Sequence, residues 1–179
     1  MKQSDLIGKS IYEADTPSLL LDLDALKANI ATMAAFFADK PSGLRPHFKS
    51  HKCTTIARMQ LTAGAVGITC AKLGEAEVLA DAGIEDILIA NQIVSKRKIE
   101  RLVQLARRAC PMVAVDSADN IQALSRAASE AGVSIRVLVE VDCGMNRCGV
   151  PPGEPALELA RIVDALPGLV FEGLQGYEG

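Results

Sequence analysis

The feature that most constrains the fold is a regular alternation of short apolar runs with longer amphipathic segments. Runs rich in Val, Ile and Leu occupy residues 86–91, 112–116, 136–142 and 169–176, and segments with helical spacing of apolar residues lie between them. Strands that alternate with helices in this way form parallel βαβ units. The runs are almost continuously apolar, which is typical of strands buried on both faces. The sequence therefore predicts an α/β fold built on a parallel sheet.

Two further strands and a lead-in precede these runs. Residues 66–71 form one apolar run, and the segment LRPHFK, residues 44–49, counts as the first strand of the repeating units. Residues 18–23 predict a strand-like lead-in, and a helix follows from about Asp24, whose carboxylate can cap it. This gives six strands of the repeating type after the first helix.

Two architectures contain such units, a doubly wound open sheet and a (β/α)8 barrel. No G-x-G-x-x-G follows the first strand, which weakens the dinucleotide-binding version of the open sheet. A closed barrel needs eight strands, whereas this sequence predicts six, and it stops on the sixth. We therefore expect a fold interrupted before completion, and both architectures stay open at this point.

Composition excludes several classes of protein. The 19 basic and 22 acidic residues give a net charge of -3, which argues against an electrostatic nucleic-acid binder. No apolar run approaches the roughly 20 residues needed to span a bilayer, and the start does not resemble a secretory signal. The 5 cysteines contain no C-x-x-C pair, so reduced thiols are expected rather than zinc or disulfides. We expect a cytoplasmic protein that binds neither nucleic acid nor membrane.

The first candidate site is the polar segment RPHFKSHK, residues 45–52, which contains both histidines of the chain. On a strand, period 2 would place four cationic or titratable residues on one side. Such residues are costly to bury unless they serve a site, and a lysine among them is a candidate nucleophilic amine. A solvated loop with two surface histidines fits the spacing as well. A metal site is weaker, because no third ligand is apparent nearby.

The second candidate site is the segment VDCGMNRCG, residues 141–149. Asp142 ends an apolar strand, Gly144 and Gly149 permit tight turns, and Arg147 projects from the loop. A loop of this kind at the carboxyl end of a strand can hold a cofactor or an anion. A plain βα turn with a surface arginine is the alternative.

Together these segments resemble a known family. The motifs are R-P-H-x-K-x-H-K at 45–52, G-I-T-C-A-K-x-G-E-A-E at 67–77 and V-D-x-G-M-x-R-x-G at 141–149. They resemble the D-threonine aldolase and eukaryotic-type D-serine dehydratase group. These are fold-type III pyridoxal-phosphate enzymes with an N-terminal barrel similar to that of alanine racemase. The resemblance runs from about residue 15 to residue 179.

The resemblance implies a fold and its domains. It implies a (β/α)8 TIM-type barrel that is truncated here after about six strands, without the C-terminal β-domain of the family. Residues 1–23 would form the N-terminal lead-in strand, and residues 24–179 a partial pyridoxal-phosphate-binding barrel domain. The full-length protein would be a homodimer, and residues 1–179 alone should not catalyse.

The resemblance also assigns residues to the site. Lys49 would bind pyridoxal phosphate covalently, and Arg147 would lie near the phenolic oxygen of the cofactor. Tyr177 would pack against the pyridine ring, and Gln175 is a further cofactor contact. The residues that could shape the charge around Lys49 are Arg45, His47 and His51.

The implied function is that of a pyridoxal-phosphate-dependent lyase acting on D-β-hydroxy-α-amino acids, by aldol cleavage or by dehydration. The alternatives are an amino-acid racemase of the alanine racemase type and a non-catalytic pyridoxal-phosphate carrier. Against the carrier, residues 69–72 are TCAK instead of the Gly-Glu-Asn that we associate with carriers. The family also uses a divalent metal, manganese or zinc, to bind the β-hydroxyl. Its ligands belong to the C-terminal domain, so no metal ligand is expected in this chain.

Overall fold

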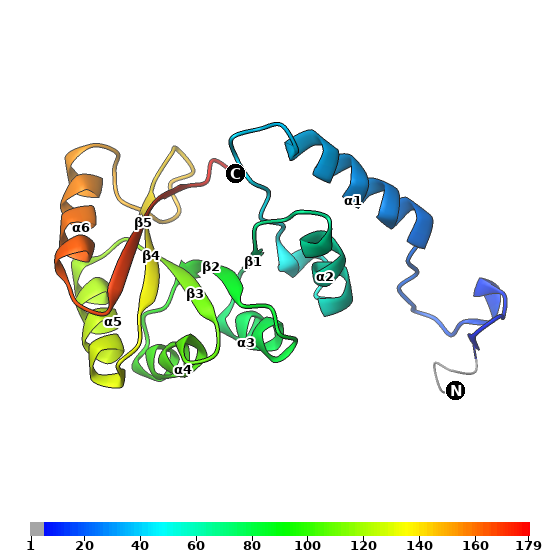
Figure 1. Cartoon of the computed structure of the whole chain (residues 1–179), viewed down its shortest axis with the longest axis horizontal. Coiled ribbons are helices and arrows are strands. Elements are labelled where there is room, and N and C mark those ends of the chain that lie inside the picture. The colour runs from blue at the N-terminus through cyan, green and yellow to red at the C-terminus, as the bar shows by residue number, and fades with distance from the viewer. Residues whose placement is uncertain (1–5) are drawn as a thin grey trace.

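A parallel sheet forms the centre of the structure, a computed structural model that describes residues 6–179 (Figure 1). Each strand pairs in parallel with its neighbour in sequence, so every connection is a βαβ crossover. The alternating pattern of the sequence is therefore confirmed. The strands are β1 (Ile68–Cys70), β2 (Asp86–Gln92), β3 (Cys110–Val115), β4 (Ile135–Val141) and β5 (Leu169–Gly176).

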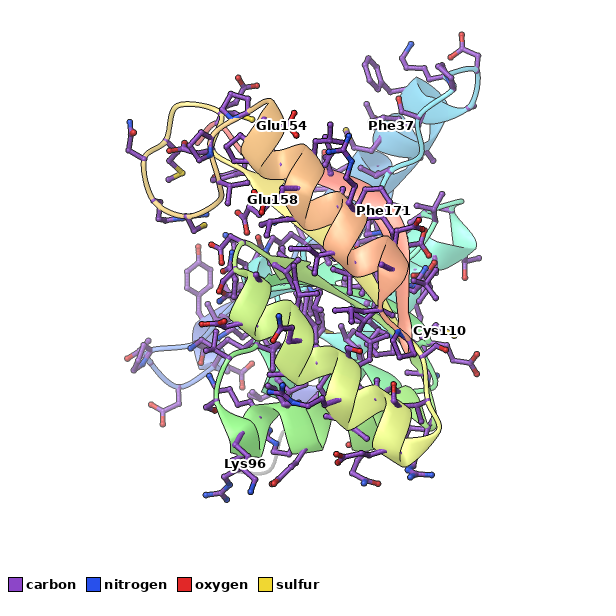
Figure 2. The ribbon with its side chains drawn as sticks, turned by 90° about the vertical axis from the view of Figure 1, so that its left-hand side faces the viewer. Phe37, Lys96, Cys110, Glu154, Glu158 and Phe171 are labelled. Atoms are coloured by element: carbon purple, nitrogen blue, oxygen red, sulfur yellow. The ribbon has the colours of Figure 1, made fainter. Side chains whose placement is uncertain are left out.

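Four helices cover one side of this sheet and contact one another in sequence order (Figure 1). They are α3 (Leu73–Asp81), α4 (Lys96–Ala106), α5 (Ala118–Ala131) and α6 (Glu154–Ala165). Figure 2 shows α5 and α6 in front of the strands, with Glu154 and Glu158 on α6.

The hydrophobic core lies between these helices and the sheet. Ile135, Val137 and Val139 of β4 are fully buried in it. Because side chains alternate along a strand, Arg136 and Glu140 lie on the opposite face of the sheet. This second face therefore carries polar groups near both of its ends.

The N-terminal part differs from the prediction. Residues 18–22 form no strand, and α1 (Leu23–Phe37) buries none of its side chains. Figure 1 shows α1 extending away from the sheet. Asp22, not Asp24, caps this helix, because Asp22 is the extended residue and its Oδ1 accepts from the N–H of Ala25 at 2.9 Å. The division of the chain at residue 23 stays a prediction, and its first five residues lie outside the described part.

The segment expected as the first strand is only partly extended. Leu44 and Pro46 accept hydrogen bonds from the N–H groups of Val66 and Thr69, at 2.9 and 2.8 Å. The chain then turns into a 3-10 helix, η3 (Phe48–Ser50), which is followed by α2 (Thr54–Thr62). Pro46 has no N–H to donate to a ladder. The described residues therefore contain five strands instead of six, and the period-2 pattern does not extend to Lys49.

An ion-pair network at the amino ends of the strands ties this segment to the sheet. The two terminal nitrogens of the Arg45 guanidinium, Nη1 and Nη2, donate to the Asp86 carboxylate at 3.0 and 3.3 Å. Arg136 of β4 binds the same carboxylate and lies 3.9 Å from Glu172 of β5. Burial raises the pKa of Asp86, but the hydrogen bonds from Arg45 and Arg136 outweigh burial and hold it below its ordinary value. A Cβ at Gly67 would lie 2.8 Å from the backbone oxygen of Asp86 and would displace the Arg45 guanidinium, so the glycine suits this position.

We expect Asp86→Asn to lower the free energy of unfolding by about 1 kcal/mol near neutral pH, because a charged acceptor of two guanidinium groups is lost from a partly solvated site. The folded-state pKa of Asp86 is depressed, so its stabilisation is present above the unfolded-state pKa and is lost as the pH falls through the folded value. Denaturant unfolding should therefore show the wild-type and variant stabilities converging below about pH 4.

Asp81→Asn is the matched control. Asp81 pairs with Arg108 on the surface, where its side chain is 69% exposed. Exposed pairs contribute about 0.5 kcal/mol or less. Equal losses for the two variants, or a loss at Asp86 that does not change with pH, would contradict the prediction.

Candidate active site

The carboxyl ends of the strands form one edge of the sheet, because all five strands run in the same direction. In parallel α/β proteins, ligands bind at this edge. Asp116 directly follows β3, Glu140 is close to the end of β4, and Tyr177 directly follows β5. Lys49 belongs to the same edge, because His47 pairs with Thr69 near the end of β1 and η3 continues beyond it.

Lys49 is presented by the η3 turn. Phe48, only 2% exposed, anchors this turn in the core, and the Nδ1 atom of His47 accepts from the N–H of Lys49 at 3.3 Å. The Lys49 side chain is exposed, and within residues 6–179 it forms no ion pair. The neighbouring Lys52 differs, since its Nζ atom lies 3.9 Å from Glu75.

Burial lowers the pKa of both histidines in this segment. For His47 the charge of Lys49 lowers it further, against an opposing effect of Glu75. For His51 burial is the main cause. A neutral imidazole can accept a hydrogen bond at one nitrogen, which is what both residues do: the Nδ1 atom of His51 accepts from the N–H of Cys53 at 3.1 Å.

In the loop after β4, the side chain of Asp142 binds backbone N–H groups that precede Arg147. The Oδ1 atom of Asp142 accepts from the N–H groups of Gly144 and Asn146, at 2.9 and 3.0 Å. Hydrogen bonds from these backbone groups lower the pKa of Asp142. Arg147 then extends over the ring of Tyr177, with 5.3 Å from the guanidinium carbon to the ring centroid. Two residues that the sequence assigned to the site are thus brought together.

A polar cluster below this loop was missed by the sequence analysis. The Nε2 atom of Gln92 donates to Asp116 at 3.0 Å and to Glu140 at 2.6 Å. Glu140 is only 4% exposed, and it also accepts from the Cys148 thiol at 3.1 Å. Burial, and then the hydrogen bond with Glu140, raise the pKa of that thiol. The signal that could have revealed the cluster is a glutamate inside the apolar run VLVEVD, since an isolated buried carboxylate is costly.

Gln175 and a cavity complete the edge. Gln175 of β5 is the register partner of Glu140, so it lies beside the polar cluster. A cavity of about 520 Å³ opens next to Lys52, Glu75 and Gln92, a size typical of small-molecule sites. A larger apolar groove, about 770 Å³, lies away from the strand ends, between α1 and the residues around α2.

Arg45 does not belong to this edge. Its guanidinium pairs with Asp86 at the amino end of β2. Lys49 comes four residues later in the chain, on η3, at the carboxyl edge of the sheet. The structure thus does not bring Arg45 and Lys49 together, and a role of Arg45 in the charge around Lys49 stays a prediction. His47 and His51 do flank Lys49, and His51 packs edge-on against Phe48 with 5.4 Å between ring centroids.

Residues 6–179 contain neither a group of metal-binding side chains nor a membrane-spanning helix. No group of three or more His, Cys, Asp or Glu side chains lies in an arrangement that could hold a metal ion. None of the helices described here is both long and apolar enough to cross a membrane.

The fold and the site define a class of protein: a parallel α/β barrel-type domain with an amine, a guanidinium and an aromatic ring at the carboxyl ends of its strands. The chain belongs to the family described as alanine racemase, N-terminal domain, whose sequence pattern matches residues 21–179. The resemblance drawn from the three motifs is thereby confirmed, and so is the barrel class of the fold.

Known relatives lie close to this chain. It is 47% identical over 172 residues to a D-threonine aldolase of Arthrobacter sp, covering 96% of this chain and 45% of that protein. It is 40% identical over 176 residues to a 3-hydroxy-D-aspartate aldolase of Paracoccus denitrificans, covering 97% and 46%. The crystal structure of D-threonine aldolase from Filomicrobium marinum is 51% identical, with a TM-score of 0.92 over 94% of this chain and 46% of that one. The chain thus spans less than half the length of these relatives.

Gly149→Ala should disrupt the base of the loop. Gly149 has φ +96°, and a Cβ there would lie 2.7 Å from the Asp142 nitrogen and 2.8 Å from the Val141 carbonyl carbon. We expect a loss of roughly 2–4 kcal/mol in the free energy of unfolding, from backbone strain together with overlap. Denaturant unfolding measures this loss.

Gly144→Ala is the matched control within the same loop. Gly144 also has positive φ, +112°, but nothing lies within 4 Å of a Cβ there. It should lose only about 1 kcal/mol, the cost of the backbone conformation. Similar losses at both glycines would show that the close approach at Gly149 does not matter.

Proposed function

We propose that these residues form the cofactor-binding barrel part of a pyridoxal-phosphate-dependent lyase that acts on D-β-hydroxy-α-amino acids. The observation that carries the proposal is the exposed amine of Lys49, which forms no ion pair within residues 6–179 and lies at the same strand edge as the Arg147–Tyr177 pair. The activities named for two relatives support the substrate class, because D-threonine and 3-hydroxy-D-aspartate both have D configuration and a β-hydroxyl group.

The residues present fit the cofactor. Pyridoxal phosphate is a flat anionic ring with an aldehyde, and it needs an amine, a cation and an apolar or aromatic surface. Lys49 offers an amine that no carboxylate of the described chain holds, and Arg147 offers a cation already aligned with the Tyr177 ring. When bound, the cofactor supplies an electron sink for the pair left behind when a bond to the substrate Cα breaks.

The chain's own residues bind and orient. The Lys49 amine would hold the cofactor, and the η3 turn fixes the position of the Lys49 backbone through buried Phe48 and the His47 acceptor. Arg147 would lie near the phenolic oxygen of the cofactor, and Tyr177 would pack against its ring. Gln175 lies between these groups and the Glu140 cluster, as a further polar contact.

The wider proposal includes a homodimer in the cytoplasm and a divalent metal, manganese or zinc, that binds the β-hydroxyl of the substrate. Within residues 6–179 the side chains offer no arrangement for that metal. Light scattering on the complete gene product tests the dimer.

We expect borohydride reduction of the complete gene product with pyridoxal phosphate to fix the cofactor to the peptide that contains Lys49. Lys49→Arg should abolish the fixation, because the guanidinium is not a nucleophile at neutral pH. Lys52→Arg is the matched control and should keep it, because Lys52 is paired with Glu75. Peptide mass spectrometry reads the site, and labelling of Lys52 or Lys72 would overturn the assignment.

The products from D-threonine and D-serine test the reaction. With pyridoxal phosphate and manganese or zinc, the complete gene product should convert D-threonine to glycine and acetaldehyde, and L-threonine should not react. Ammonia with a keto acid would indicate a dehydratase instead, and the L-isomer would indicate a racemase. Cofactor binding with no product from either substrate would favour the carrier.

A further inference from the structure

The starting point is an irregularity in β2. Ile89 pairs with Val113 of β3, but the next register pair joins Gln92 to Ala114, so two residues of β2 are extra. Asn91, one of these, fixes the local backbone: its Oδ1 atom accepts from the N–H of Gln92 at 3.0 Å, and its Nδ2 atom donates to the Ala71 carbonyl at 3.2 Å. Bulges next to sites commonly re-aim a side chain. Here the bulge brings the Gln92 amide to the ends of β3 and β4.

The Gln92 amide joins two carboxylates. Its Nε2 atom carries two hydrogens, and it donates one to Asp116 at 3.0 Å and one to Glu140 at 2.6 Å. Within residues 6–179 no lysine or arginine pairs with either carboxylate. The carboxylates carry like charges, which repel one another at short range. The amide is therefore the group that holds them together.

The same two carboxylates hold the loop that carries Arg147. The Oδ2 atom of Asp116 accepts from the N–H of Gly149, and the Oε1 atom of Glu140 accepts from the Cys148 thiol, both at 3.1 Å. Cys148 and Gly149 directly follow Arg147. On its other side, the Asp142 carboxylate fixes residues 144 and 146. Arg147 is thus placed between two anchored segments.

We propose that Gln92 is a positioning residue for Arg147. Its amide holds Asp116 and Glu140 in the arrangement that anchors the loop, so the β2 bulge determines where the Arg147 guanidinium lies relative to Tyr177. The consequence for cofactor affinity rests on the proposed function, whereas the anchoring of the loop does not.

Hydrogen exchange on the cofactor-free complete gene product tests the anchoring. Gln92→Leu has a similar size and removes both donors, and it should raise the exchange rates of amides within 142–150 by about tenfold, the loss of one hydrogen bond to a charged group. Gln92→Asn is the second variant in case the first does not fold, because its shorter amide cannot span both carboxylates. The control is Gln104→Leu, on the exposed face of α4, which should leave 142–150 unchanged. Unchanged exchange in both folded Gln92 variants would overturn the proposal.

A double-mutant cycle on cofactor affinity separates positioning from a general structural effect. Arg147→Ala should raise the dissociation constant of pyridoxal phosphate by about tenfold, for one charged contact. If Gln92 acts through Arg147, Gln92→Leu should weaken binding in the wild-type background and have no further effect in the Arg147→Ala background. Additive losses would overturn the positioning role. No loss in Arg147→Ala alone would instead refute the proposed role of Arg147, and the exchange experiment would still decide whether Gln92 anchors the loop.

Discussion

Parallel pairing of the five strands is the constraint on which the rest of the structure depends. It sends every strand end of one kind to the same edge, so residues far apart in sequence meet there. The carboxylates at the two edges are bound by different kinds of group. At the amino edge, Arg45 and Arg136 neutralise Asp86. At the carboxyl edge, an uncharged amide holds the carboxylates of the polar cluster, and the cations Lys49 and Arg147 are left to other partners.

Under the proposed function, this difference leaves two cations of the carboxyl edge available to a ligand. A salt bridge to Lys49 or Arg147 would hold that cation in place and remove it from the ligand, whereas the ion pair at this edge joins Lys52 to Glu75. The Gln92 amide satisfies two carboxylates without using a cation. The loop is then held by the backbone N–H of Gly149 and by the Cys148 thiol, neither of which carries a charge that an anionic ligand would need. Arg147 can therefore have a fixed position without pairing with any carboxylate of residues 6–179.

The sequence predicts the regular part of this fold well. The apolar run 169–176 coincides with β5, as the sequence predicts. Such elements follow from local periodicity, which the chain expresses within a few residues. The prediction of a strand over residues 44–49 was wrong for a local reason that hydrophobic periodicity does not reveal. Its pattern alternates like a strand, but Pro46 lacks a donor and His47 caps a turn, so Lys49 lies on a 3-10 helix.

The site divides in the same way between local and distant signals. Lys49 and Arg147 lie in compact motifs and could be singled out from sequence. The polar cluster could not, because Gln92 and Glu140 are 48 positions apart and meet only through parallel register and a bulge of two residues. Glu140 alone gave a usable signal, since a carboxylate in an apolar strand loses its hydration on folding. A leucine at 140 would avoid that cost, but it would leave the Cys148 thiol without its acceptor and the Gln92 amide with Asp116 as its single carboxylate partner. The buried Glu140 carboxylate therefore lowers the stability of the fold, but its hydrogen bonds fix the geometry of the loop.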